Sequence, residues 1–113
     1  MPQQLPMVPS VSNYRFGTSL GDGTFVFDVH WNERAESYYL DVLTFDAVPI
    51  RTGMRLNLGR LVGVESADPR MPDGEFIVAD LSGEGAEATF SDMGERVVVF
   101  FYSREELEEL GAV

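Results

Sequence analysis

Apolar and polar residues alternate along two neighbouring stretches, 24–31 and 37–44, in the first half of the chain. Alternation of this kind is the period of a strand with one buried face. Both stretches are rich in aromatic and β-branched residues, which favour strands, and the short polar segment 32–36 joins them. We therefore predict a β-hairpin at the centre of the fold. The side chains expected to be buried, here and in a later strand, are Phe25, Phe27, Val29, Trp31, Leu40, Val42, Val97, Val99 and Phe101.

Further strands are expected on both sides of this hairpin. They cover 14–20, 50–58, 75–81, 89–90 and 96–102, while 61–64 form a short strand or a bend, and loops or turns are expected at 65–74 and 82–86. Gly53 is a candidate bulge position. In 75–81 the buried face is carried either by Phe76 and Val78 or by Ile77 and Ala79. The unbroken apolar run 96–102 is typical of a strand that is buried on both faces.

A short helix is expected after the last strand. Ser103 and Glu106 have the spacing of a capping box, in which each side chain bonds the backbone N–H of the other residue. Leu107 and Leu110 would share one helix face, and Gly111 would end the helix. Together these elements predict an all-β protein: a small antiparallel barrel or sandwich with a short C-terminal helix.

The chain is divided into an extended N-terminal arm, residues 1–13, and a single β domain, residues 14–113. Prolines at positions 2, 6 and 9 remove backbone donors and hold their neighbours extended. The arm nevertheless carries apolar side chains: Leu5, Met7, Val8 and Val11. Two alternatives follow. The arm is mobile and orders along a neighbouring subunit, or it packs on its own domain.

The charge narrows the classes of partner. The formal net charge is -11, and the eight basic residues include no lysine. Such a field repels nucleic acid and anionic membrane surfaces. The negative charge either keeps the protein soluble or attracts a basic partner. The chain has no cysteine, which excludes a disulfide framework or a thiolate metal site. We also expect neither a signal peptide nor a membrane span.

No set of residues has the spacing of a catalytic, metal or cofactor site. His30 is the single histidine and has no catalytic partner in the sequence. The many carboxylates do not follow a calcium-loop pattern, and most stand beside turn residues. Trp31, Tyr38, Tyr39 and Phe25 would suit a sugar-stacking platform. They also suit the core of a small β domain and its rim.

Three segments together resemble a known family. They are 31–42, beginning Trp-Asn-Glu-Arg and continuing to Tyr-Leu-Asp; 49–56, beginning Pro-Ile-Arg-Thr-Gly; and the late apolar run 94–102. In this order and spacing the chain is similar to the small baseplate plug-like proteins of contractile-tailed bacteriophages. The resemblance covers most of residues 5–110, while 65–90 match loosely, and no catalytic residue comes with it.

The resemblance implies a structural virion protein of the tail baseplate, assembled in the host cytoplasm. It would act near the distal end of the tail tube through contacts with other baseplate and tail-tube proteins, and as a homo-oligomer within the particle. No nucleic acid, direct membrane insertion or cofactor is expected. The candidate interface residues are Leu5, Met7, Val8, Val11, Asn32, Glu33 and Arg34. The alternative is a small carbohydrate-binding β module, which would depend on the aromatic residues; a glycan-cleaving enzyme ranks third.

Overall fold

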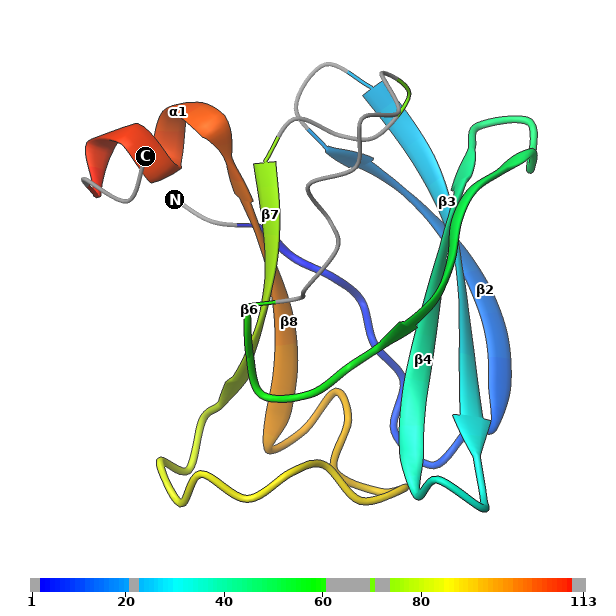
Figure 1. Ribbon diagram of the computed structural model, residues 1–113, viewed down its shortest axis with the longest axis vertical. Helices are drawn as coiled ribbons and strands as arrows, with labels where there is room; N and C mark the ends of the chain where they lie inside the picture. The colour runs from blue at the N-terminus through cyan, green and yellow to red at the C-terminus, as the bar shows by residue number, and fades with distance from the viewer. Residues whose placement is uncertain (1–2, 21–22, 61–69, 71–73, 111–113) are drawn as a thin grey trace.

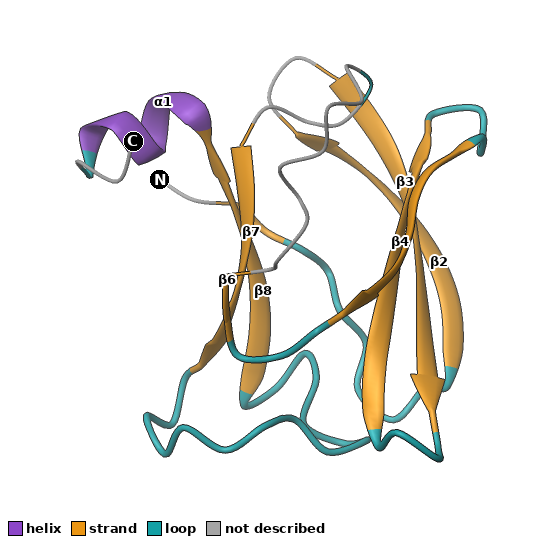
Figure 2. Cartoon of the chain, viewed as in Figure 1, coloured by secondary structure: helices purple, strands orange, loops and turns teal. Residues whose placement is uncertain are grey.

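The computed structural model describes residues 3–20, 23–60, 70 and 74–110 (Figure 1). The described elements are β1 (Gln3–Gln4), β2 (Asn13–Leu20), β3 (Gly23–Asn32), β4 (Ser37–Thr44), β5 (Pro49–Arg55), β6 (Gly59–Arg60), β7 (Gly74–Asp80), β8 (Val97–Ser103) and α1 (Arg104–Glu109). The strands form two antiparallel sheets, ordered β1-β8-β7-β6 and β2-β3-β4-β5 (Figure 2). The predicted all-β class is confirmed, and of the two architectures considered the chain adopts the sandwich.

Aromatic side chains connect the two sheets through the core. Phe27 of β3 and Phe76 of β7 meet edge to face, with ring centroids 6.0 Å apart. Phe16 stacks on Phe27 within one sheet, and Phe101 packs on Phe76 within the other. Aromatic pairs in such offset or edge geometry add stabilisation beyond the area that they bury. The core thus lies between the sheets, as the alternation of the strands predicts.

The predicted central hairpin forms from β3 and β4, with Trp31 opposite Tyr38 and Asn32 opposite Ser37. All the side chains predicted to be buried are buried except Trp31, which is half-buried. Trp31 stands one pair before the turn, at the end of the sheet. Among the described residues, Tyr38 and Phe90 are the ones that make ring contacts with the indole there. The alternation gives the face of Trp31 correctly, but it does not reveal how far the opposite sheet extends.

The structure shows which face of the 75–81 strand is buried. In β7 the buried side chains are Phe76 and Val78. Residues 97–99 of β8 are all buried, so the strand is enclosed on both faces there, although Phe100 and Tyr102 are only half-buried. The predicted short strand at 89–90 is wrong. Thr89 donates two hydrogen bonds to the Asp92 carboxylate instead, which holds a turn.

The N-terminal arm packs on its own domain. Gln3 and Gln4 pair with the edge of β8, and the Leu5 N–H donates to the Val99 carbonyl at 2.8 Å. Leu5 is fully buried and Met7 is 8% exposed. The alternative of an arm that is free in the monomer is therefore wrong for these residues. The prolines still limit pairing, and β1 is accordingly an edge strand of only two residues.

The C-terminal helix confirms the capping box. Ser103 accepts a hydrogen bond from the Glu106 N–H, and the Glu106 carboxylate accepts one from the Ser103 N–H. Leu107 is buried against the sheet, whereas Leu110 is 67% exposed. The prediction that Leu110 shares the helix face of Leu107 is wrong, because the α-helix ends at Glu109, before the Leu110 side chain reaches the sheet.

Irregular backbone appears where glycine was expected to permit it. Gly53 has a φ of 72°, and the register between β4 and β5 shifts next to it. The predictions for residues 61–64, for most of the loop 65–74 and for Gly111 lie outside the described residues. In the described part of the chain, none of the helices is both long and apolar enough to span a bilayer.

Candidate functional site: the loop end of the sandwich

The apolar side chains of the arm are divided between the core and the surface. Leu5 and Met7 point inward, while Val8 and Val11 are 43% and 36% exposed. The Val8 N–H donates to the Tyr14 hydroxyl at 2.9 Å, which fixes this part of the arm against β2. Leu5 and Met7 are therefore corrected from candidate interface residues to core residues. Val8 and Val11 remain available for an interface.

The other predicted interface residues lie in the turn between β3 and β4. Asn32, Glu33 and Arg34 are all exposed. The Asn32 side chain accepts a hydrogen bond from the Ala35 N–H at 3.0 Å, which shapes the turn. Glu36 closes it with a φ of 51°, in the left-handed region that favours glycine. The turn is thus a defined surface feature with charged side chains.

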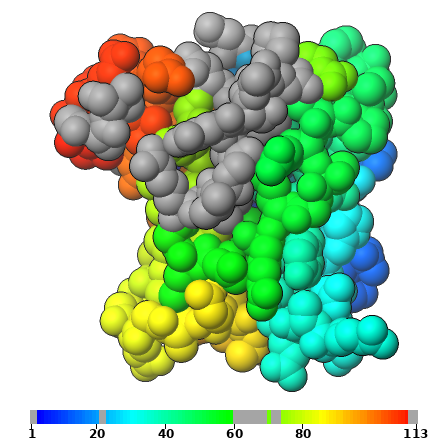
Figure 3. Space-filling view, in the orientation of Figure 1, coloured from blue at the N-terminus to red at the C-terminus, as the bar shows by residue number. Residues whose placement is uncertain are grey.

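Hydrogen bonds bring the arm and the turn to the same end of the molecule. The Trp31 N–H donates to the Ser12 carbonyl at 2.7 Å, and the Ser10 N–H donates to the Phe90 carbonyl at 3.2 Å. Three segments therefore lie together: 8–12, 32–36 and 81–92. We call this the loop end. Figure 3 shows the later loop, in yellow to orange, beside the cyan turn at the lower end of the molecule.

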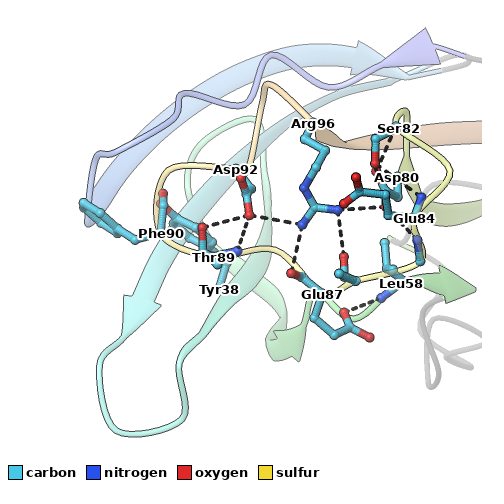
Figure 4. A network of polar contacts seen from close by, with 12 residues as sticks. Tyr38, Leu58, Asp80, Ser82, Glu84, Glu87, Thr89, Phe90, Asp92 and Arg96 are labelled. Atoms are coloured by element: carbon cyan, nitrogen blue, oxygen red, sulfur yellow. Dashed lines mark hydrogen bonds and ion pairs between the residues drawn. The ribbon is translucent and has the colours of Figure 1, made fainter.

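Arg96 holds the 81–92 loop in place. Its guanidinium pairs with the carboxylates of Asp80 at 2.7 Å and Asp92 at 3.0 Å. It also donates to the carbonyls of Ala86 and Glu87, both at 2.9 Å (Figure 4). One planar guanidinium thus bonds four acceptors, for which its fixed fork of donors is well suited. The loop is anchored although it lacks strand structure.

The same network lowers the pKa of both carboxyls. Hydrogen bonds from Arg96 and then from Thr89 lower the pKa of Asp92 to about 2. Hydrogen bonds from Ser82, and to a lesser degree from Gly85, lower the pKa of Asp80, with the charge of Arg96 adding to the effect. Both groups therefore stay ionised at neutral pH, and the ion pairs that anchor the loop persist.

Tyr38 ties the loop to the central hairpin. Its hydroxyl donates to the Phe90 carbonyl at 2.5 Å, and its ring stacks on that of Phe90, with centroids 6.2 Å apart. Burial raises the pKa of Tyr38 to about 12, so the phenol keeps its proton and the bond is retained. Phe90 is thus placed next to Trp31, at a centroid distance of 5.5 Å.

A cleft of about 460 Å³ opens between the turn and the loop. One wall is formed by Trp31, Glu33 and Glu36, and the other by residues 87–90. The cleft combines a partly exposed indole with three carboxylate side chains. The cleft is therefore both concave and chemically distinctive.

Of the two interpretations of the aromatic residues, the sugar-stacking platform is not supported by the structure. Phe25 is 9% and Tyr38 1% exposed, so neither ring offers a face to a ligand. Trp31 and Tyr38 share one face of the sheet, whereas Tyr39 is paired with His30 on the other face. The interpretation of these aromatic residues as the core and its rim is the correct one for Phe25 and Tyr38.

A group of possible metal ligands lies on the outer face of the same sheet. Ligand atoms of Asp28, His30 and Asp41 all lie within 4.8 Å of one another. The His30 ring bonds Asp41 at 2.8 Å and Asn13 at 3.1 Å. Arg15 bonds both oxygens of Asp28, which lowers the pKa of that carboxyl. These bonds cross-link adjacent strands and use the donor atoms that a cation would need, so the group does not favour a metal site.

The chain matches the model of one protein family, described as cyanophage baseplate Pam3 plug gp18, over residues 3–105 of 113. The chain belongs to this family. It is a structural component of the phage tail baseplate, as the resemblance implied, and the family is one of baseplate plug proteins, not of enzymes. A comparison with curated proteins finds no match. That His30 has no catalytic role remains a prediction.

Several residues of the loop end were not predicted from the sequence. Glu36, Glu87 and Phe90 line the cleft, but they come from segments with no periodic pattern. One signal was present: Asp92 and Arg96 stand four residues apart with opposite charges, beside a glycine-rich loop. Opposite charges at this spacing can form an ion pair that closes a loop, and not only one along a helix.

A further exposed apolar feature lies at the opposite end of β4. In the turn between β4 and β5, Phe45 is 76% and Val48 44% exposed. The turn is held by bonds from the Thr44 and Ala47 backbone N–H groups. The sequence of a turn does not show which way its side chains point, so this exposed feature is visible only in the structure.

Proposed function

We propose that this baseplate protein works as a plug at the distal end of the tail tube and that the loop end is its main contact surface. The observation that carries the proposal is the position of two exposed valines, Val8 and Val11, beside the charged turn 32–36. Apolar side chains inside a rim of charged ones are typical of a contact patch.

The anchoring of the loop end suits this role. A surface that is already ordered loses less conformational entropy on association than a mobile one. The bonds of Arg96 and Tyr38 keep the 81–92 loop in place, and those of Trp31 and Ser10 hold the arm. The protein would therefore dock as a rigid body.

The partners in this proposal are tail-tube and other baseplate proteins, together with further copies of the chain as a homo-oligomer in the particle. A net charge of -11 opposes close packing of acidic copies. The surfaces that face the loop end should therefore be basic. Assembly takes place in the host cytoplasm, before the particle is released.

The test replaces the valines and measures incorporation into particles. Phage lacking the gene are complemented with the wild type, with Val8→Ser/Val11→Ser, or with Leu110→Ser as an apolar-to-polar control far from the loop end. The copies per purified particle are counted by mass spectrometry. We expect wild-type levels with the control and a marked loss with the double variant, while both proteins melt like the wild type. Normal incorporation of the double variant would place the contact surface elsewhere.

A further inference from the structure

Three glutamates line the cleft at the loop end, and none of the described residues forms an ion pair with their carboxylates. Glu33 and Glu36 are exposed on one wall, and no hydrogen bond or ion pair joins either carboxylate to another of the described residues. Glu87 on the facing wall accepts one hydrogen bond from the Leu58 N–H at 2.8 Å through a single oxygen. The walls thus present carboxylate oxygens that are free to accept further hydrogen bonds.

The cleft also carries an aromatic surface in a fixed position. Trp31 is half-buried, and its ring is tilted by 61° to those of both Tyr38 and Phe90. The Phe90 ring is in turn held by its stacking on Tyr38. Aromatic faces attract cations, and a guanidinium prefers to stack flat on them. The fixed rings and the free carboxylates therefore select the same kind of ligand.

We propose that this cleft receives an arginine side chain from a neighbouring baseplate protein. The inference rests on the proposed function and gives the contact its chemistry. The guanidinium lies against the Trp31 indole and donates to the carboxylates of Glu33 and Glu36, as in other bidentate arginine–carboxylate pairs. The turn between β4 and β5 of a second copy would fit the cleft less well than an arginine. Its exposed Phe45 stands beside Asp46, which would meet the acidic walls of the cleft.

Glu36 supports the proposal in a second way. Its φ of 51° is one that glycine or asparagine adopts more readily. A glutamate at such a position costs folding stability, and strained positions of this kind concentrate at functional sites. A carboxylate needed in the cleft would account for the residue found here.

The experiment uses Trp31, the single tryptophan of the chain, as a reporter on the full-length protein. Its fluorescence is followed while N-acetyl-arginine-methylamide is added, and separately the citrulline isostere, which has the same shape but no charge, and N-acetylglucosamine. The variants are Glu33→Gln/Glu36→Gln and the matched control Glu108→Gln/Glu109→Gln, which removes two exposed carboxylates from the C-terminal helix. We expect a saturable change with the arginine compound alone, and about tenfold weaker binding in the cleft variant only.

Binding should also weaken with salt, because the screening length falls from about 10 Å at 0.1 M to about 3 Å at 1 M. An equal response to the citrulline compound, an equal loss in the control variant, or no response to the arginine compound would overturn the proposal. A response to the sugar alone would assign the cleft to a carbohydrate instead. If the fluorescence test fails while the wild-type chain is present in particles, the arginine contact is wrong and the plug function stands.

Discussion

Replacing Leu5 with alanine tests whether the N-terminal arm belongs to the core. Leu5 is fully buried, and its N–H bonds Val99 of the central strand β8. Leucine-to-alanine changes in rigid cores cost about 2.7–5.0 kcal/mol, according to how far the site can collapse. Leu5 follows the two-residue edge strand β1, where some relaxation is available. We therefore expect a loss of about 3 kcal/mol in the free energy of unfolding.

The melting temperature should fall accordingly. A chain of this length has an unfolding entropy of roughly 0.24 kcal/mol per kelvin, so about 3 kcal/mol corresponds to about 12 °C. The assay is thermal and urea unfolding followed by circular dichroism, with Val8→Ala as the control, because Val8 is 43% exposed. The control should change stability by less than about 0.5 kcal/mol. If Leu5→Ala melted like the wild type, the arm would be only loosely attached and its assignment to the core would be refuted.

Three further predictions concern residues in or next to the loop end. Gly94→Ala should destabilise the fold by more than about 2 kcal/mol in urea unfolding. The φ of Gly94 is 93°, and an added Cβ would lie 2.6 Å from the Met7 carbonyl oxygen. A neutral effect would contradict this close approach. The unfolding free energy that Asp92→Asn loses relative to the wild type should be largest above about pH 4 and should shrink as the pH falls towards 2. The reason is that the pKa of Asp92 is lowered from 3.8 to about 2, so its ionised form stabilises the fold. A difference that is constant from pH 6 to pH 2 would be inconsistent with the ion pair to Arg96. Glu36→Gly should raise the unfolding free energy by up to about 1.5 kcal/mol. Relief of the left-handed backbone gives about 1–2 kcal/mol, and the freedom of glycine in the unfolded chain takes back about 0.5–1 kcal/mol. A lower melting temperature would show that the glutamate is not strained.

Much of the fold follows from local patterns in the sequence. Alternation predicts the hairpin 24–44 and its inner face, because a strand with one covered side must alternate. The capping box at Ser103 is predicted because it needs only residues three apart. Family membership was also recognisable, since it depends on the order of short segments and not on their contacts.

Other features depend on distant contacts and were missed or misjudged. Trp31 is half-buried because the sheet ends there, and alternation cannot report where a facing layer stops. Leu5 is buried because Val99, far along the chain, offers its carbonyl. The cleft needs Arg96 to bring the Glu87 loop to the turn. Each of these facts concerns residues that are remote in sequence, so no single stretch contains the signal.

The most direct test of the account is a density map of the intact phage tail. We expect this chain in the baseplate at the distal end of the tail tube, with its loop end against a neighbouring protein. An arginine side chain of that neighbour should lie on Trp31 and between the cleft glutamates. A map that places the chain outside the baseplate, or that leaves the loop end facing solvent in the assembled particle, would contradict it.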